Sequence, residues 1–367
     1  MKKKYGFMMS AVLAAGTLLS ACGTGDTNNE SSGGGSGGEE GDKNNFKVAM
    51  VTDTGGVDDK SFNQSAWEGL QMFGEENGLE EDKGFKYVQS TAASDYQPNL
   101  SGLVRDNYDL IFGIGFLMQQ DIQAIAQQKP EAQLALVDSV AVNESGDPLE
   151  NVASITFKEH QGSFLVGVIA GMQTKSNKVG FIGGVDSELI KKFENGFKAG
   201  VKSVNPDAEI FEQYAGDFNA AEKGQAIAGT LYDKGADIIY HAAGGTGNGV
   251  FTEAKNRAKN GEEVWVIGVD RDQHEEGMPE NVTLTSMVKR VDTAVIEVSK
   301  QTMDDSFPGG KVTEFGLEED GVGIAETQEN VSEEALKKVE EYKEKIQKGE
   351  LEVPKTDEEF ETFKSSL

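Results

Sequence analysis

The feature that most restricts the fold is a regular alternation of short apolar runs with longer amphipathic segments, which begins at Phe46. Short apolar runs bounded by turn residues are typical of buried strands, and segments with apolar residues at helical spacing predict covering helices. Chains with this alternation form α/β layers around parallel sheets. The predicted strands are residues 46–52, 85–89, 109–113, 133–137, 152–157, 178–182, 209–214, 237–242, 264–269 and 282–288. The predicted helices include residues 61–76, 159–174, 189–204, 220–234 and 247–259, with a further amphipathic helix at 331–348. Because both halves share this rhythm, the sequence predicts two doubly wound parallel-sheet lobes.

Polar residues and glycines follow almost every predicted strand. In parallel sheets, ligands bind beyond the carboxyl ends of the strands, so these positions are candidates for a site. Any one of them is explained as well by a turn, but their recurrence favours a binding site. The residues concerned are Asp53, Gly115, Phe116, Asp138, Gly244, Gly245, Asp270 and Lys289.

The most informative segment is residues 52–69, which runs from a predicted strand through a glycine turn into the start of a predicted helix. Phe62 falls in the first helical turn, where its ring could cover a flat ligand. Asn63 and Gln64 can both donate and accept hydrogen bonds. Periodicity alone favours Phe62 as a buried core residue, with contact to a ligand as the alternative.

Residues 244–249, Gly-Gly-Thr-Gly-Asn-Gly, lie between a predicted strand and a predicted helix, where free amides favour an anion. Asp270 could serve as the acidic residue of a dinucleotide site. However, the motif does not follow the first strand and lacks the G-x-G-x-x-G spacing. No Walker lysine follows it, so ATP hydrolysis is not supported. We interpret the motif as a turn near a ligand and expect no cofactor.

Catalytic patterns are missing from the sequence. Its three histidines are His160, His241 and His274, and it has no G-x-S-x-G elbow or H-E-x-x-H motif. The acidic stretches at 58–59 and 270–272 could hold a cation, but helix capping and loop solvation explain such stretches more often. We therefore expect a binding protein with no catalytic residues and no metal, rather than an enzyme.

Residues 1–21 predict a signal peptide, because the lysines at 2–4 precede an apolar stretch at 8–19 that is too short for a permanent membrane span. It ends in Leu-Ser-Ala before Cys22, which resembles the lipobox of bacterial lipoproteins. Cys22 is the expected lipidation site, with palmitate as one acyl chain; the alternative is a stray thiol behind an ordinary secretory signal. It is the single cysteine of the 367 residues, so disulfides are excluded.

Residues 22–45 combine the lipidated cysteine with a flexible tether rich in Gly, Ser, Asn, Asp and Glu. Without the three signal lysines, the 34 basic residues fall to 31 against 63 acidic ones, and the formal net charge changes from −29 to −32. Such a charge repels nucleic acid and anionic lipid. We therefore expect no nucleic-acid partner, and membrane association through the lipid anchor alone.

Three stretches resemble the basic membrane protein family of bacterial lipoproteins, which includes the PnrA-like purine nucleoside-binding proteins. They are V-T-D-T-G-G-V-D-D-K-S-F-N-Q-S-A-W-E-G from residue 51, F-I-G-G-V from residue 181 and F-E-N-G-F-K-A-G-V from residue 193. The resemblance extends from Phe46 to about Lys348. It implies a type I periplasmic-binding-protein fold with hinge strands: an N-terminal lobe of residues 46–155 plus about 271–300, and a C-terminal lobe of residues 156–270 plus about 301–367.

The resemblance also implies capture of a nucleoside, with purines preferred, for the permease and ATPase subunits of an ABC importer at the extracytoplasmic face of the cell membrane. Phe62 and Phe193 would clamp the base, although Phe218 and Phe116 are further candidates for the second ring. Asp53, Asn63 and Asp138 would bond polar edges of the base or ribose. The ribose hydroxyls would be held by Asp270 and Lys289, and the sugar approached closely by Gly244 and Gly245.

A different class of function stays open beside the importer component: a surface receptor or sensory lipoprotein that uses the same fold for a sugar or another small metabolite. The sequence alone does not rank the nucleosides, because discrimination at the base edge depends on geometry. We expect the chain to act as a monomer.

Overall fold

The computed structural model describes residues 45–367, so the predicted signal peptide, Cys22 and nearly all of the predicted tether lie outside the described residues. Residues 42–367 form one compact unit. This unit contains both sheets and their covering helices, and it therefore has a complete core of its own. Within the described residues, no helix combines the length and apolar character needed to cross a membrane.

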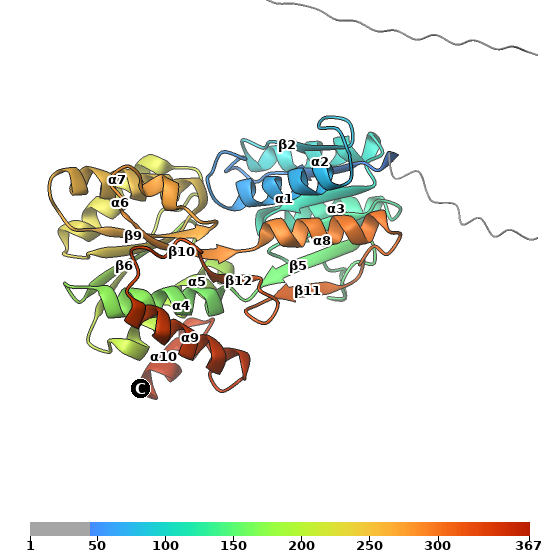
Figure 1. Cartoon of the computed structure of the whole chain (residues 1–367). Helices are drawn as coiled ribbons and strands as arrows, with labels where there is room; N and C mark the ends of the chain where they lie inside the picture. The colour runs from blue at the N-terminus through green and yellow to red at the C-terminus, as the bar shows by residue number, and fades with distance from the viewer. Residues whose placement is uncertain (1–44) are drawn as a thin grey trace, which may run out of the picture. The chain divides into compact units, whose positions relative to one another are not determined.

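Two six-stranded sheets, one in each lobe, form the framework (Figure 1). The first has the order β11-β5-β4-β3-β1-β2 and is parallel throughout. Its strands are β1 (Val48–Val51), β2 (Phe85–Val88), β3 (Leu110–Ile114), β4 (Leu134–Val137), β5 (Val152–Phe157) and β11 (Val312–Phe315). The second has the order β12-β10-β9-β8-β6-β7, with β12 antiparallel to β10. Its strands are β6 (Lys178–Gly183), β7 (Glu209–Tyr214), β8 (Ile238–Ala242), β9 (Trp265–Asp270), β10 (Thr283–Lys289) and β12 (Val322–Ile324).

Helices cover both faces of each sheet, as expected for buried parallel strands. In the first lobe, α1 packs against α8 and α2 against α3; in the second, α4 packs against α5 and α6 against α7. The first-lobe helices are α1 (Phe62–Glu76), α2 (Tyr96–Arg105), α3 (Gln119–Gln128) and α8 (Val291–Met303). Those of the second lobe are α4 (Glu159–Gln173), α5 (Glu188–Val204), α6 (Ala221–Asp233), α7 (Gly247–Lys259), α9 (Glu333–Gln347) and α10 (Asp357–Ser365). The last two lie against α4 and α5, respectively (Figure 1).

All ten predicted strands occur, with ends shifted by at most two residues. β11 and β12 were not predicted, because they are short edge strands in which Thr313, Glu314 and Gly323 interrupt the apolar pattern. Because these two strands were not predicted, the expected lobe boundaries were also wrong. The segment at 271–300 was assigned to the first lobe, but β10 belongs to the second sheet; β11, assigned to the second lobe, belongs to the first sheet.

The chain passes between the lobes three times, at Lys158, at Arg290 and through residues 316–321. These crossings are bonded to neighbouring backbone. The Lys158 amide donates to the Phe315 carbonyl at 2.9 Å, and the Arg290 amide donates to Gly321 at 2.9 Å. Three short connections of this kind can act as a hinge between two rigid bodies.

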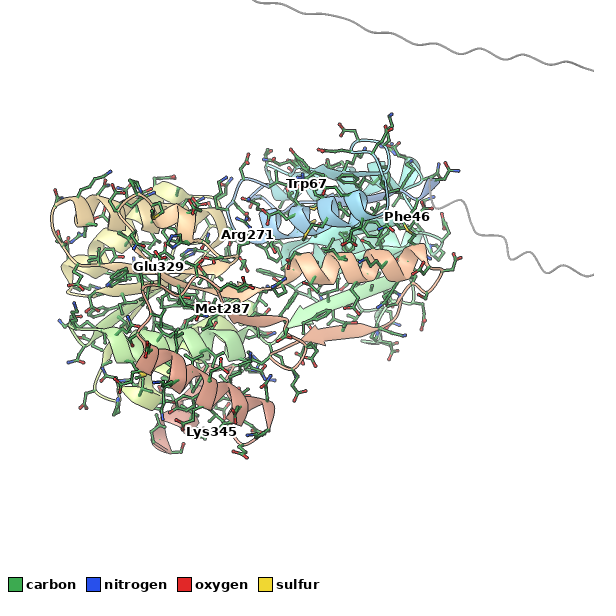
Figure 2. All side chains as sticks on the ribbon, in the orientation of Figure 1. Phe46, Trp67, Arg271, Met287, Glu329 and Lys345 are labelled. Carbon is green, nitrogen blue, oxygen red and sulfur yellow. The ribbon has the colours of Figure 1, made fainter. Side chains whose placement is uncertain are left out.

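Each lobe is stabilised by dense side-chain packing. In the first, the Trp67 ring of α1 lies 5.6 Å from Phe85 and 4.9 Å from Tyr87 on β2, measured between ring centroids (Figure 2). In the second, α4 and α5 approach so closely that a Cβ added at Gly200 would lie 2.0 Å from the Phe164 carbonyl oxygen. Glycine is required there because two helix backbones are in contact.

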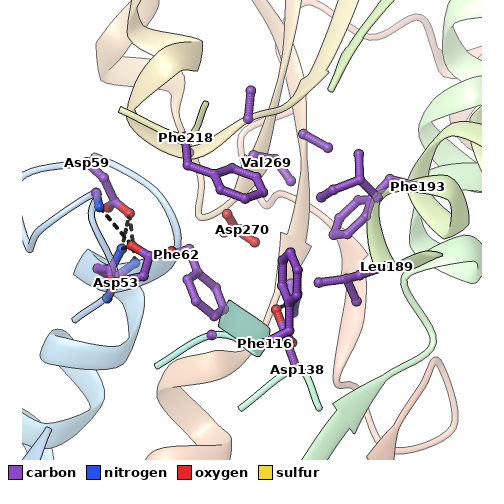
Figure 3. Close-up of a pocket in the computed structure, with 18 residues that line it drawn as sticks. Asp53, Asp59, Phe62, Phe116, Asp138, Leu189, Phe193, Phe218, Val269 and Asp270 are labelled. Carbon is purple, nitrogen blue, oxygen red and sulfur yellow. Dashed lines mark hydrogen bonds and ion pairs between the residues drawn. The ribbon is translucent and has the colours of Figure 1, made fainter. Parts of the chain in front are cut away.

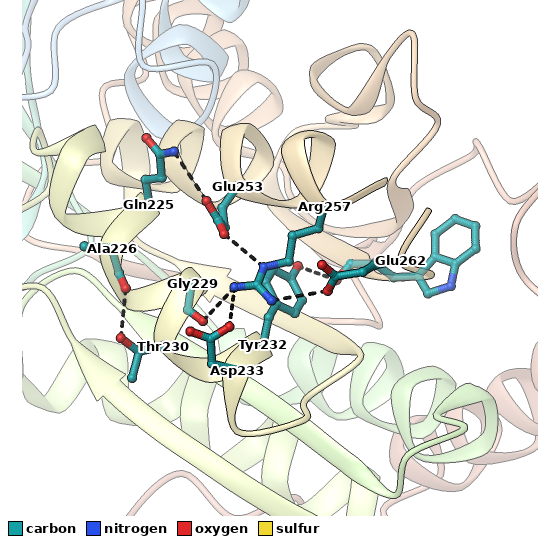
Figure 4. Close-up of polar contacts among 10 residues, drawn as sticks. Gln225, Ala226, Gly229, Thr230, Tyr232, Asp233, Glu253, Arg257 and Glu262 are labelled. Carbon is teal, nitrogen blue, oxygen red and sulfur yellow. Dashed lines mark hydrogen bonds and ion pairs between the residues drawn. The ribbon is translucent and has the colours of Figure 1, made fainter. Parts of the chain in front are cut away.

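A network around Arg257 ties α7 to α6 in the second lobe (Figure 4). Its guanidinium donates to Asp233 at 2.6 Å, Glu253 at 2.9 Å and Glu262 at 3.2 Å, and also to the Gly229 carbonyl. These carboxylates raise the pKa of the Arg257 guanidinium above its usual value, despite the opposing effect of burial. Partly buried ion pairs that share one guanidinium stabilise more than isolated surface pairs.

Candidate functional site

A pocket lies between the two lobes, at the carboxyl ends of the strands of both sheets (Figure 3). It contains about 520 Å³ of space, including its opening to solvent. Eight of the nine ligand-binding residues expected from the sequence line its wall: Asp53, Phe62, Asn63, Asp138, Phe193, Gly244, Asp270 and Lys289. In parallel α/β folds, the carboxyl ends of the strands are where small molecules bind.

Gly245 is the exception among the expected residues. It is buried in the 3₁₀ turn η4 (Gly244–Thr246), and the pocket is lined by its neighbour Gly244 instead. A Cβ at Gly245 would face Asn219 and the Asp59 side chain, at 3.4 and 3.7 Å. A Cβ would make only ordinary van der Waals contacts there, so the contact between the lobes does not require a glycine at this position.

The other glycines of residues 244–249 serve packing. A Cβ at Gly247 would lie 2.1 Å from the His241 ring, and one at Gly249 would lie 1.8 Å from the Ala221 carbonyl oxygen. These glycines let α7 begin against α6 and the buried imidazole. Burial lowers the pKa of His241 to about 4, so this ring is neutral. The loop is thus a packing turn beside the pocket, and its glycines are accounted for without a phosphate.

The loop before α1 positions two pocket residues through Asp59. The Asp59 carboxylate accepts from the amides of Ser61, Asn63 and Gln64, and so caps the helix. It also accepts from the Asn63 side-chain amide at 2.9 Å, and that amide donates to Asp53 Oδ1 at 2.7 Å. In turn, Asn63 Oδ1 accepts from the Asp53 backbone amide. Asn63 therefore uses its polar atoms to orient Asp53 (Figure 3).

Two pocket carboxylates are held by strained backbone at strand ends. Asp138, after β4, has a φ of +68°, and Asp270, at the end of β9, has a φ of +66°. Non-glycine residues seldom adopt this left-handed conformation, which costs about 1–3 kcal/mol and recurs at binding sites. It turns both side chains into the space between the lobes (Figure 3).

Lys289, at the end of β10, is surrounded by carboxylates. Its ammonium lies 2.5 Å from Asp138 and 3.5 Å from Glu159, which is bonded on its other oxygen to Lys192 at 3.1 Å. Although burial lowers the pKa of Lys289, Asp138, Glu159 and Asp270 raise it above its usual value. The lysine is charged, and its charge is neutralised by the protein.

The remaining carboxyl groups have raised pKa values, because burial disfavours their ionised forms. Burial raises the pKa of Asp53 to about 6, against hydrogen bonds from Gly55 and Asn63. It raises the pKa of Asp270 to about 7, against Lys289 and a hydrogen bond from the Ser61 hydroxyl. Four aspartates line the pocket, and Lys289 is the one basic side chain on its wall within the described residues. The pocket therefore disfavours anions.

Four phenylalanine rings surround the same space: Phe62 and Phe116 from the first lobe, Phe193 and Phe218 from the second (Figure 3). Phe116 and Phe218 meet edge to face across the lobes at 6.2 Å. Phe193 is 3% exposed, and the Lys289 ammonium lies 5.6 Å from its ring. Phe62 and Phe218 are only partly buried.

Some residues of the pocket wall were not predicted from the sequence. Asp59 was interpreted as one of an acidic pair used in capping; it does cap α1, but it also lines the pocket. Its position shortly before the polar start of a helix is the signal that could have identified it. The apolar residues Leu189, Ile190 and Val269 also line the pocket, and no sequence signal separates them from core residues. Among the described residues, no group of three or more His, Cys, Asp or Glu is arranged to hold a metal.

The family described as ABC transporter substrate-binding protein PnrA-like matches residues 46–357. The chain belongs to this family. It is 41% identical over 364 residues to the ABC transporter nucleoside-binding protein BmpA of Lactococcus lactis, an alignment that covers 96% of this chain and 99% of the relative. It is also 50% identical over 363 residues to the CD4+ T-cell-stimulating antigen of Listeria innocua, with the same coverage. Basic membrane protein A of Borreliella burgdorferi is 36% identical over 86% of this chain and 90% of its own length.

Solved structures of ABC transporter solute-binding proteins have a similar fold. An ABC transporter solute-binding protein from Aeropyrum pernix superposes with a TM-score of 0.76 at 26% identity, over 86% of this chain and 96% of that one. One from Conexibacter woesei gives a TM-score of 0.65 at 23% identity, over 84% of this chain and 99% of that one. The predicted two-lobed type I periplasmic-binding-protein fold is therefore confirmed.

Membership of this family has direct consequences. The Bmp-family chain is the solute-binding component of an ABC transporter, so its partners are a ligand and the transporter's permease and ATPase subunits. Such a component works outside the cytoplasm, and the family is one of binding proteins rather than enzymes.

Proposed function

We propose that this Bmp-family protein captures nucleosides, with purines preferred, in the pocket between its lobes. The observation that carries the proposal is the combination of aromatic rings with aspartate oxygens in one interlobe space. A purine nucleoside has flat apolar faces, polar edges and adjacent hydroxyl groups, which this combination complements. The relative from Lactococcus lactis, an ABC transporter nucleoside-binding protein, supports the same class of ligand.

Phe62 and Phe218 are our choice for the rings that stack on the base. Both are partly buried and come from opposite lobes, whereas Phe193 is almost fully buried. Stacking of a base on one aromatic side chain contributes about 1–3 kcal/mol. This choice replaces Phe193 by Phe218 in the pair expected from the sequence, and it leaves Phe193 as a buried residue of the pocket wall.

The aspartates provide acceptors for the donor groups of a nucleoside. Asp53 Oδ1 is occupied by the Gly55 amide and Asn63, which leaves its second oxygen for a base N–H. Asp138 Oδ1 is buried and has no hydrogen-bond partner among the described residues. Asp270 can accept from ribose hydroxyls beside Lys289. Buried acceptors of this kind discriminate strongly against a ligand that lacks the matching donor.

The first test is calorimetry on residues 42–367 with guanosine, inosine, adenosine, cytidine, GMP, ribose and arabinose. We expect saturable binding of at least one purine nucleoside, and binding of GMP at least about tenfold weaker than guanosine because the pocket is acidic. Phe62→Ala, Phe218→Ala and Asp270→Ala should each weaken the bound nucleoside by at least about tenfold, or about 1.4 kcal/mol. Binding of sugars alone, or unchanged affinity in all three variants, would contradict the proposal.

Affinity should fall as the pH falls. Hydrogen bonds to an ionised carboxylate are stronger than those to a neutral carboxyl group, so a nucleoside favours the ionised forms of Asp53 and Asp270. Since burial raises their pKa values to about 6 and about 7, affinity should be full near pH 8 and decrease through this range. Calorimetry from about pH 8 to about pH 5.5 measures the change.

Folding stability supplies the control, because its pH dependence has the opposite sign. A raised folded-state pKa stabilises the protein at low pH, and that stability is lost as the pH rises through about 6 and about 7. As the pH falls, these two groups should therefore not destabilise the ligand-free protein, although the affinity for the nucleoside decreases over the same range. Asp270→Asn should show a shallower decrease in affinity; an equally steep one would contradict the assignment to Asp270.

We further propose that Cys22 is lipidated, with palmitate as one of its acyl chains, and that these chains hold the protein at the extracytoplasmic face of the cell membrane. The sequence before Cys22 supports lipidation, and the anchor would keep the pocket near the permease and raise its local concentration there. Incorporation of labelled palmitate into the wild type but not into Cys22→Ala tests this. Equal labelling of both would contradict it.

A further inference from the structure

The loop between β1 and α1 reaches the second lobe through its backbone carbonyl groups. Three side-chain amides of that lobe donate to it: Asn219 to Thr54 at 2.9 Å, Asn248 to Asp59 at 3.3 Å and Gln273 to Lys60 at 2.9 Å. We call Asn219, Asn248 and Gln273 the interlobe amides. None of the three lines the pocket. They connect the lobes directly, without a ligand between them.

The second lobe holds the backbone of Asn219 and Asn248 and the side chain of Gln273. The Asn219 backbone amide donates to Asp217 at 2.9 Å, and Asn248 lies in the first turn of α7. Gln273 is buried, and its side-chain oxygen accepts from the Val269 amide at 2.9 Å and bonds to His241 at 3.1 Å. The Gln273 donor is thus fixed by the second lobe before it contacts the first.

The loop also connects to the pocket. The Asp59 carbonyl accepts from Asn248, while the Asp59 carboxylate fixes the Asn63 amide, which orients Asp53 in the pocket wall. A further contact across the lobes follows on α1, where Arg271 donates to both oxygens of Glu68 at 2.9 and 2.6 Å (Figure 2). A single loop therefore links the contact between the lobes to the orientation of a pocket carboxylate.

We propose that the interlobe amides are positioning residues, which stabilise the closed arrangement of the lobes and couple it to the orientation of Asp53. They raise the affinity for a ligand without touching it. If a ligand binds only the closed form, its apparent affinity is the intrinsic affinity multiplied by the fraction of molecules that are closed. Residues that favour closure therefore increase the affinity indirectly.

The substitutions that test this keep side-chain shape and remove one donor. Asn219→Asp and Asn248→Asp replace an amide that donates to a carbonyl by a carboxylate that cannot donate. Asn219 is exposed and Asn248 half-buried, so neither change disturbs a core. Asn260→Asp is the matched control, because Asn260 is exposed and lies directly after the other end of α7.

The first measurement needs no ligand and is independent of the proposed nucleoside function. Residues 42–367 contain no cysteine, so Met72→Cys in the first lobe and Met278→Cys in the second, both exposed in the wild type, provide two unique labelling sites. Interlobe distances from electron spin resonance then report open and closed populations. We expect Asn219→Asp/Asn248→Asp to shift the closed-to-open ratio toward open by about tenfold or more, and Asn260→Asp to leave it unchanged.

The second measurement is the affinity and dissociation rate of guanosine. The double variant should bind at least about tenfold more weakly, with most of the change in the dissociation rate. Phe62→Ala should weaken binding without changing the ligand-free distances, which separates contact from positioning. Ligand-free distances equal to those of Asn260→Asp would overturn the proposal. If no nucleoside binds the wild type, the nucleoside function fails while the distance measurement still decides this inference.

Discussion

Gly200→Ala is expected to destabilise the protein by at least about 3 kcal/mol, enough to remove much of the stability of an ordinary domain. The new Cβ would lie 2.0 Å from the Phe164 carbonyl oxygen, so α4 and α5 would have to separate along their length. The two helices are in equally close contact at neighbouring glycines, because a Cβ at Gly196 or Gly167 would also lie 2.2 Å from a backbone oxygen. Urea unfolding of residues 42–367 measures the loss.

Gly102→Ala is the matched control for this substitution. Gly102 is also within a helix, α2, but a Cβ there would meet only the end of the Arg105 side chain, at 3.9 Å. Alanine is favoured over glycine in an open helical position by about 0.5–1 kcal/mol, so this variant should be as stable as the wild type or more stable. Equal free energies of unfolding for the two variants would show that α4 and α5 are not in backbone contact.

Lys289→Met is expected to reduce stability by about 3–5 kcal/mol and to remove nearly all ligand affinity. Methionine retains the length and apolar part of the side chain but leaves Asp138, Glu159 and Asp270 without their shared cation. Since Lys289 lowers the pKa values of Asp270 and Glu159, its removal should raise both. The stability lost should therefore be greatest above about pH 7 and smaller at about pH 5.

Lys289→Met/Glu159→Gln separates charge from packing. Glutamine removes one buried negative charge at nearly constant volume, so the double variant should recover part of the stability lost by Lys289→Met above about pH 7. Affinity should not return, because the ammonium beside Asp138 and Asp270 is still missing. No recovery of stability, together with a loss that does not change with pH, would mean that Lys289 acts through its apolar contacts.

The strands and several helices were predictable because their signals are local. The strands predicted at residues 152–157 and 209–214 are β5 and β7 with the same ends. The edge strands β11 and β12 were not predicted, since three or four residues that carry Thr, Glu or Gly have too little pattern to distinguish them from a loop. Their pairing with distant strands determines where the chain crosses between the lobes.

The candidate site was predictable in part for the same reason. Residues that follow strands of a parallel sheet gather at one edge, and eight of the nine expected residues line one pocket. The role of Asn63 was not predictable, because its amide is used by Asp53 and Asp59. Gly245 and Gly247 belong to the predicted ligand-proximal turn, but Gly245 does not line the pocket and Gly247 packs closely against His241.

The sequence by itself determined the α/β class, the two lobes and the chemistry available at the strand ends, because apolar periodicity and strand-end position are properties of neighbouring residues. Only the tertiary structure decided which groups act together. Lys289 meets Asp138 across 151 positions, and Gln273 meets Lys60 across 213. The pKa values of Asp53 and Asp270 also depend on burial between two lobes. These effects arise from distances and dielectric surroundings that no local pattern encodes.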